Sequence, residues 1–463
     1  MNDQTETIER PEDETEDDYA LRNRVVAAAV QATNAGDRAR LLEVFEPLHP
    51  ADIADLLEQV GLEDRTRILQ LAGDYIDGEI LSEIDEDIRD GVVEILEPTV
   101  LADAVRELES DDVVDILEDL GDEQQEAVLE ALDVVDRIAV EQALAYPEFS
   151  AGRLMQREVV IAPEHWSVGD AIDHMRAQDD LPEQFYHVVL VDPRHRPTAY
   201  VTLGRLMSSP RDVLLSAITE DSFRTFDAVE DEGDVAYAFN QYHLITAPVV
   251  DEDGRLVGVI TIDDAMAVLD EEHEEDVLRL GGVGDESLSN STLEIVKRRF
   301  PWLGINLATA ILASIVISIF EDVLQAVVAL AVLMPIVASM GGNAGTQSMT
   351  VAVRALATRD LTGSNAWRVV RREAVAGLLN GLIFAVVMGI VGLIWFGSPA
   401  IGAVIAVAMV VNLLVAGLSG VLVPLALDKA GIDPALASGT FVTTVTDVVG
   451  FFAFLGLASW VLL

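Results

Sequence analysis

The chain has 463 residues and contains no cysteine, which excludes disulfide bonds and thiolate metal sites. Its formal net charge of −51 would repel the phosphates of DNA and RNA and argues against nucleic-acid binding. Two lysines stand against 27 arginines, and diffuse acidity with so little lysine is typical of proteins from salt-accumulating, halophilic microbes. In such a chain a single acidic cluster is weak evidence for a binding site.

Residues 1–20 are acidic and polar, so we expect a disordered tail there and no signal peptide. Residues 21–148 carry leucines at helical spacing, which predicts a superhelix of short amphipathic helices. Two segments of this region resemble each other, namely LHPADIADLLEQVGLEDRTRILQL from Leu48 and LESDDVVDILEDLGDEQQEAVLEAL from Leu108. A repeat of this kind presents a face to a partner and is not typical of a catalytic domain.

Residues 149–270 contain a second duplication, HVVLVDPRHRPTAYVTLGRLM and APVVDEDGRLVGVITIDDAM. Each copy has the pattern of strand, turn, strand and helix, and DEDG between two β-branched runs is a good hairpin signal. The pattern predicts a pair of β-α-β-β-α modules. Residues 271–300 pass from acidic to polar to basic, and we expect a connecting helix there that leads into the membrane.

Residues 301–463 are apolar in blocks long enough to cross a bilayer, which predicts five transmembrane helices. The blocks are 302–320, 323–356, 374–396, 400–427 and 435–462. Basic residues precede the first block and separate the second from the third and the fourth from the fifth, whereas the opposite loops have none. The bias places residues 1–300 in the cytoplasm and the C-terminus outside a multi-pass membrane protein.

Two residues of the membrane part are candidates for a cation pathway. Asp447 is the only acid in the middle of a span, and an ionisable residue there marks function. Asn343 lies in PIVASMGGNAGTQ, where we expect glycines to break the helix beside a cavity; close helix packing through small residues is the alternative. One carboxylate with neutral oxygens suits hydrated Mg²⁺, and the absence of cysteine disfavours soft metals.

The whole arrangement resembles the MgtE family of magnesium channels, in which a helical domain, tandem cystathionine-β-synthase (CBS) domains, a connecting or plug helix and five membrane helices follow in this order. The segments that carry the resemblance are LHPADIADLL, YPEFSAGRLM, PIVASMGGNAGTQ, VRALATRDL and GIDPALASGTFVTTVTDVVG. The likeness covers nearly the whole chain after the tail. It implies a homodimer in membrane lipid, with a central pore lined by the second and fifth membrane helices.

The resemblance also implies roles for individual residues. Asp447 would bind hydrated Mg²⁺ in the pore, with Gly450 beside it and Asn343 from the second membrane helix. Regulatory carboxylates would bind cytoplasmic Mg²⁺ and favour the closed state. They correspond to Asp264, Glu272, Glu275, Asp276 and Asp433.

The sequence departs from the family pattern at three positions. His243 stands where an aspartate is frequent, Ala267 where another acid is expected, and Phe149 where YPEDSAG is usual, so the number and affinity of sensor sites stay open. We expect a Mg²⁺-selective, Mg²⁺-gated channel that imports magnesium and is not an enzyme. The alternatives are an exchanger, a channel for Co²⁺ or Mn²⁺, a CBS-regulated membrane metalloenzyme, and a sensor that binds adenine nucleotide at the CBS pair.

Overall fold

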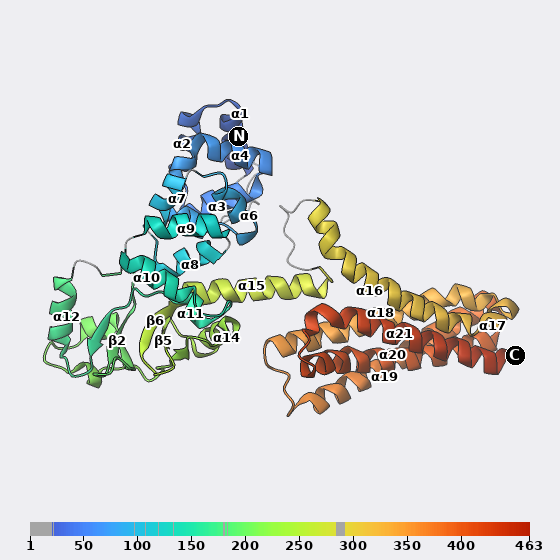
Figure 1. Ribbon diagram of the computed structural model, residues 1–463. Helices are drawn as coiled ribbons and strands as arrows, with labels where there is room; N and C mark the ends of the chain where they lie inside the picture. The colour runs from blue at the N-terminus through green and yellow to red at the C-terminus, as the bar shows by residue number, and fades with distance from the viewer. Residues whose placement is uncertain are drawn as a thin grey trace, which may run out of the picture. The chain divides into compact units, whose positions relative to one another are not determined.

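The computed structural model describes residue 21 and the ranges 23–96, 98–106, 108–118, 120–132, 134–178, 181–182, 184–283 and 292–463. The expected tail (1–20) and the middle of the expected connector (284–291) lie outside the described residues. The chain divides into two compact units, Met1–Glu271 and Glu272–Leu463 (Figure 1).

The first part of the first unit is helical, as predicted. Each helix packs on the next few along the chain, as in a superhelix. The repeat is confirmed, because Ile53, Leu56 and Leu57 of α3 are buried like Val113, Ile116 and Leu117 of α8. The helices are α1 (Asn23–Asn34), α2 (Arg38–Phe45), α3 (Pro50–Gln59), α4 (Leu62–Ala72), α5 (Gly78–Ser82), α6 (Glu86–Val93), α7 (Pro98–Val105), α8 (Ser110–Glu118), α9 (Asp122–Ala131) and α10 (Val134–Ala143).

The second part of the first unit holds two three-stranded sheets in the same order, β1-β2-β3 and β4-β5-β6. In each sheet the first two strands are parallel and the last two form a hairpin. The two hairpin turns are alike, because Asp192 and Asp251 each accept two backbone N–H bonds within the turn. The duplicated pattern therefore folds as predicted. The strands are β1 (Ile161–Pro163), β2 (His187–Val191), β3 (Pro197–Thr202), β4 (Phe226–Asp227), β5 (Thr246–Val250) and β6 (Leu256–Thr261); the helices are α11 (Ala151–Leu154), α12 (Val168–Ala177), α13 (Leu203–Ser208), α14 (Glu232–Tyr242) and α15 (Ile262–Leu280).

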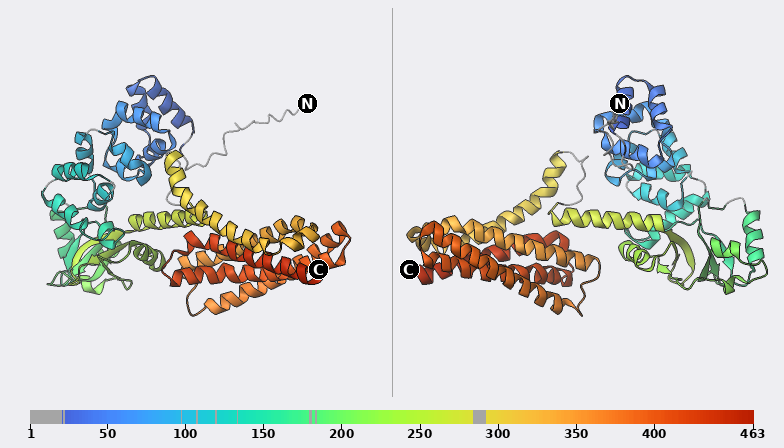
Figure 2. Two further views of the ribbon diagram at one scale, coloured as in Figure 1. Left: turned by 45° about the vertical axis from the view of Figure 1, so that its right-hand side comes forward. Right: turned by 180° about the vertical axis from the view of Figure 1, so that it is seen from behind.

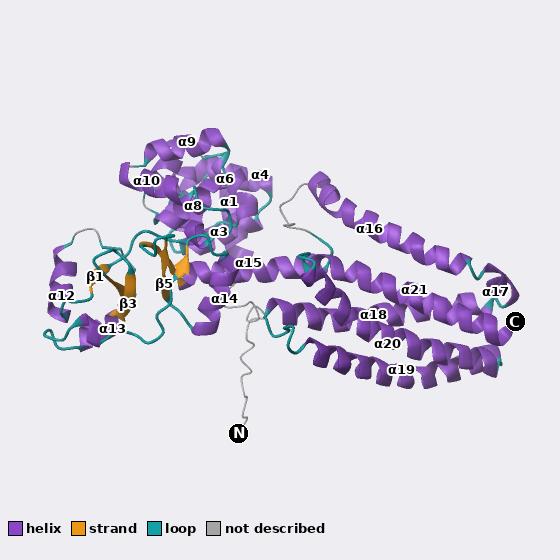
Figure 3. Cartoon of the chain, turned by 60° about the horizontal axis from the view of Figure 1, so that its bottom comes forward, coloured by secondary structure: helices purple, strands orange, loops and turns teal. Residues whose placement is uncertain are grey.

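Within the described residues of the second unit, five helices are long and apolar enough to cross a membrane. Figures 2 and 3 show α18 to α21 side by side as a bundle, and α20 is the most buried span. The long helices are α16 (Thr292–Ser318), α18 (Ala329–Ala357), α19 (Ala366–Phe396), α20 (Pro399–Lys429) and α21 (Pro434–Leu462); the short α17 (Glu321–Ala326) precedes α18.

Two expectations about the membrane part are wrong. The glycines near Asn343 do not break the second span, because α18 is continuous through residues 341–345. The third span begins at Ala366, so Arg368, Arg371 and Arg372 lie in the first turns of α19 and not in a loop. Glu373 is also helical, and it accepts a hydrogen bond of 3.0 Å from the Ser348 hydroxyl of α18.

Candidate cation pathway and acidic clusters

The pathway candidates lie on two helices that pack together, Asn343 on α18 and Asp447 on α21. Asn343 is exposed and donates from Nδ2 to the Ser339 hydroxyl over 3.3 Å, and Asp447 is half-buried. A Cβ at Gly345 would lie 2.6 Å from Cγ1 of Val442, so α18 and α21 approach through this glycine. The glycines thus serve close packing, which is the alternative interpretation, and the neutral oxygen offered here is the Asn343 side chain.

Gly450 is buried on α21 and faces α20. A Cβ at this position would lie 2.9 Å from Oδ1 of Asn412, a fully buried residue of α20. Asn412 was not among the residues predicted from the sequence, although it is one of the few polar residues inside an otherwise apolar span.

A first acidic cluster lies in the second unit, where the end of α15 meets the start of α21, and contains three of the predicted regulatory residues. Glu275 and Asp276 are on α15, and Asp433 caps α21 by accepting the Ala435 N–H over 2.7 Å. Arg279 lies among them, with its guanidinium 2.5 Å from Glu275 and 3.3 Å from Asp433. Burial, and then the charge of Asp433, raise the pKa of Asp276.

A fourth predicted residue, Glu272, and an arginine that was not predicted lie on the same helix as this cluster. Glu272 lies one turn before Asp276 on α15, with an exposed side chain. Arg279 was missed by the sequence reasoning, although a basic residue four positions after Glu275 is a recognisable helical ion-pair pattern. The guanidinium already supplies positive charge where a divalent cation is expected.

The second acidic cluster lies inside the first unit and joins α8 to the start of α15. Its members are Glu109, Asp111, Asp112 and Asp264. Burial is the largest cause of the raised pKa of each carboxyl, and Asp264 is a repulsive neighbour of the other three. The pKa of Glu109 and of Asp112 rises to about 7 and that of Asp264 to about 6, whereas the pKa of the buried Asp111 rises well above its ordinary range.

Asp264 is held by Thr261, whose hydroxyl donates to its carboxylate over 2.6 Å. Glu109 accepts a bond of 2.6 Å from the Gln156 amide. Of this cluster, only Asp264 was predicted from the sequence. The acids at and just before the start of α8 lie in the repeat that begins at Leu108, but in so acidic a chain their residue type does not distinguish them.

Neither cluster is a preformed chelate. Among the described residues, no group of three acidic or histidine side chains is close enough to hold one metal ion. The carboxylates near Asp264 repel one another instead, and a divalent cation between any two of them would relieve that repulsion. The arrangement therefore suits a bridging ion that keeps several water ligands.

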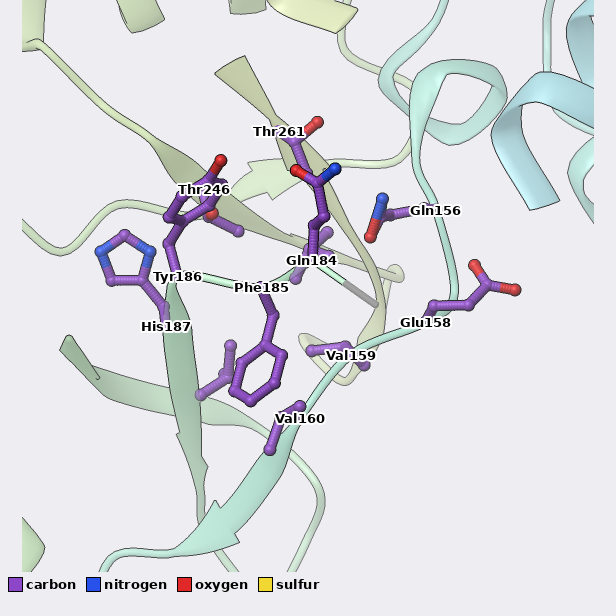
Figure 4. A pocket seen from close by; sticks show the side chains of 12 residues that line it. Gln156, Glu158, Val159, Val160, Gln184, Phe185, Tyr186, His187, Thr246 and Thr261 are labelled. Carbon is purple, nitrogen blue, oxygen red and sulfur yellow. The ribbon is translucent and has the colours of Figure 1, made fainter. Parts of the chain in front are cut away.

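A cleft in the CBS-like part lies between the two sheets (Figure 4). Aromatic residues Phe185 and Tyr186 and polar residues such as Gln156, Glu158 and Thr261 line it. The buried His187 Nδ1 has no hydrogen-bond partner among the described residues, and burial lowers the pKa of this imidazole. The lining combines flat rings with polar groups, as expected of a small-molecule site.

Two of the three positions that depart from the family pattern have left-handed backbone. Phe149 has φ 57° and His243, which ends α14, has φ 54°. Aspartate is among the residues that tolerate this conformation best. The backbone conformation is therefore reason enough for an aspartate at these two positions in other family members. Its replacement by Phe149 and His243 in this chain does not by itself mean that a metal ligand is lost.

Comparisons of different parts of the chain with known proteins agree on one family. Profiles described as "MgtE intracellular N domain", "CBS domain" and "Divalent cation transporter" match residues 48–149, residues 151–212 with 218–271, and residues 334–457. The chain is 32% identical to the magnesium transporter MgtE of Thermus thermophilus, over 96% of this chain and 99% of that protein. It is 29% identical to the MgtE of Bacillus subtilis, over 90% and 92%. A crystal structure of the cytosolic domain of the Mg²⁺ channel MgtE in complex with ATP is 28% identical, with a TM-score of 0.48 over 52% of this chain and 99% of that one.

Proposed function

The chain belongs to the MgtE family of magnesium transporters, and on this basis we propose that it conducts Mg²⁺ across the cytoplasmic membrane along α18 and α21. The observation that supports this pathway is Asp447, the only acid in the middle of a described span, on a helix packed against the one that bears Asn343. A single carboxylate and an amide oxygen fit an ion that keeps most of its water. Gly450 would allow α21 to approach its neighbour at the level of the site.

A homodimer would supply a second Asp447, and the pathway would then lie on the two-fold axis of the dimer. The soluble half would lie in the cytoplasm and the C-terminus outside, as the basic residues indicate. Mg²⁺ is the transported ion, and its binding to cytoplasmic sites outside the pathway would regulate transport according to the cytoplasmic Mg²⁺ concentration.

We propose that the two acidic clusters perform this sensing. Mg²⁺ that bridges Asp264 to the acids of α8, or Asp276 to Asp433, binds most tightly when those carboxylates are close together. A ligand shifts an equilibrium only by its difference in affinity for the two states. Cytoplasmic Mg²⁺ therefore favours the compact, closed state, and the raised pKa values of Asp264 and Asp276 support such a site.

The test is Mg²⁺ flux into liposomes that contain the purified protein. Asp447→Ala should abolish flux without loss of assembly, and Asp447→Asn should also damage it because the charge is lost at constant shape. Asp428→Asn is the matched control, since this exposed acid lies near the end of α20. Normal flux in Asp447→Ala would show that the pathway is wrong. Co²⁺, Mn²⁺ and Ca²⁺ as competitors distinguish a Mg²⁺ channel from a channel for other cations, and an imposed ion gradient distinguishes an exchanger.

A second candidate function is binding of an adenine nucleotide in the CBS cleft. The aromatic lining at Phe185 and Tyr186 and the unsatisfied His187 Nδ1 favour it. Titration with ATP in the presence of Mg²⁺ should give saturable binding that Tyr186→Ala weakens. A lack of binding at millimolar ATP would exclude this role.

A further inference from the structure

Asn412 is an amide in the interior of the membrane bundle. It is fully buried in the middle of α20, where its neighbours are valine, leucine and alanine. Its Nδ2 donates to the backbone carbonyl of Val337 on α18 over 2.7 Å, and its Oδ1 has no hydrogen-bond partner among the described residues. A buried polar group in a membrane is costly, so its position calls for a specific role.

Two glycines on two other helices make room for this amide. A Cβ added to Gly341 of α18 or to Gly450 of α21 would lie 2.9 Å from Oδ1 of Asn412. Carbon atoms essentially never approach so closely, so neither position accepts a larger residue while Asn412 stays in place. One side chain of α20 thus contacts both pathway helices at a single level.

The contact lies next to the candidate ligands. Gly341 precedes Asn343 by two residues, and Gly450 follows Asp447 by three. At a rise of about 1.5 Å per residue, each contact is about 3–5 Å along the helix axis from its ligand. A shift of α18 or α21 at Asn412 therefore changes the relative height of the Asn343 amide and the Asp447 carboxylate.

We infer that Asn412 is a positioning residue that sets cation selectivity, by holding Asn343 and Asp447 at one relative height. This inference rests on the proposed pathway. Mg²⁺ demands near-ideal octahedral geometry and retains its water, whereas Ca²⁺ accepts longer and more variable distances. Loosening the contact should therefore weaken discrimination against Ca²⁺ more than it slows Mg²⁺.

The test replaces the amide at nearly constant volume. Asn412→Leu fills the same space but cannot donate to Val337. In liposomes, the concentration of Ca²⁺ that halves Mg²⁺ flux should fall about three- to tenfold, in keeping with the loss of one buried hydrogen bond. Ser419→Ala is the matched control. Within the part of the chain that the structure describes, this buried hydroxyl of α20 bonds to Ala416 of its own helix and to no other helix, so its loss should leave the ratio unchanged. Wild-type selectivity in Asn412→Leu would overturn the inference.

A double variant covers the case in which Asn412→Leu does not assemble. Gly450→Ala should reduce the yield of assembled protein because the added methyl collides with the amide. Asn412→Ala in the same chain removes the collision, so assembly should recover while selectivity against Ca²⁺ stays poor. The inference would be contradicted if the double variant recovered both assembly and selectivity against Ca²⁺. It would also be contradicted if the two substitutions together reduced the yield of assembled protein by the sum of their separate effects.

The two proposals fail separately. If Asp447→Ala still conducts, the pathway itself is wrong. If Asp447→Ala is inactive and the Asn412 variants keep wild-type selectivity, only the role of Asn412 is wrong.

Discussion

Replacing Asp112 by asparagine should stabilise the first compact unit at neutral pH. Burial, and then the charge of Asp264, raise the pKa of the Asp112 carboxyl from its ordinary 3.8 to about 7. The unfolded chain releases this proton near pH 4, but the folded unit retains it until about pH 7. The folded unit therefore loses stability as the pH rises through this interval, since the unfolded state binds fewer protons there.

The size of the effect follows from the proton equilibrium. If water were excluded, a pKa of about 7 in place of 3.8 would cost the folded unit about 4 kcal/mol at high pH. The side chain is only partly buried, so screening reduces this to roughly 2 kcal/mol. Asparagine also gives up the attraction of a carboxylate to the N-terminus of α8, about 0.5 kcal/mol. We expect a net gain of about 1–2 kcal/mol at pH 8 and almost none at pH 4.

Urea unfolding of residues 1–283 measures this gain, with EDTA present to remove divalent ions. Asp212→Asn serves as a control, because this acid is exposed and lies in another part of the unit. A gain of equal size at pH 4 and pH 8, or a loss at pH 8, would refute the reasoning from burial and repulsion. Addition of Mg²⁺ at pH 8 should then stabilise the wild type more than Asp112→Asn, if the ion bridges this carboxylate to Asp264.

Three further predictions concern gating and the membrane bundle. Arg279→Met should lower the Mg²⁺ concentration that half-inhibits flux by about two- to fivefold, because Mg²⁺ no longer has to displace a guanidinium from Glu275 and Asp433. Arg279→Lys, which keeps the positive charge, should change this concentration little. A higher half-inhibiting Mg²⁺ concentration in Arg279→Met would contradict the prediction. Moderate Mg²⁺ in concentrated KCl should protect the soluble half from protease, whereas extra KCl of equal ionic strength should not. At 1 M salt, screening already limits the repulsion between carboxylates to about 3 Å, so further screening has little effect. Equal protection by both salts would favour plain charge screening over bridging by Mg²⁺. Glu373→Gln should keep Mg²⁺ flux, because its carboxylate lies near the start of α19, where it accepts from Ser348, and Asp447 is the only acid in the middle of a described span. Complete loss of flux would place a second acid in the pathway.

Much of the fold was predictable because its signals are local. The buried triplets of α3 and α8 repeat with helical spacing, and the hairpins after His187 and Thr246 repeat with the same aspartate in each turn. Continuous apolar runs predict membrane helices from their length alone. Asp447 stands out for the same reason, since a charge within such a run is visible without any knowledge of its neighbours.

What only the tertiary structure decided is which residues from distant segments meet. A glycine both weakens a helix and permits close approach, so the sequence around Asn343 is compatible with a break or with packing. Which of the two occurs depends on the residue that packs against the glycine. Against Gly341 this residue is Asn412 of α20, which also faces Gly450. The acids of α8 likewise look like any other acids of the chain until the fold brings them to Asp264, where burial and mutual repulsion change their chemistry.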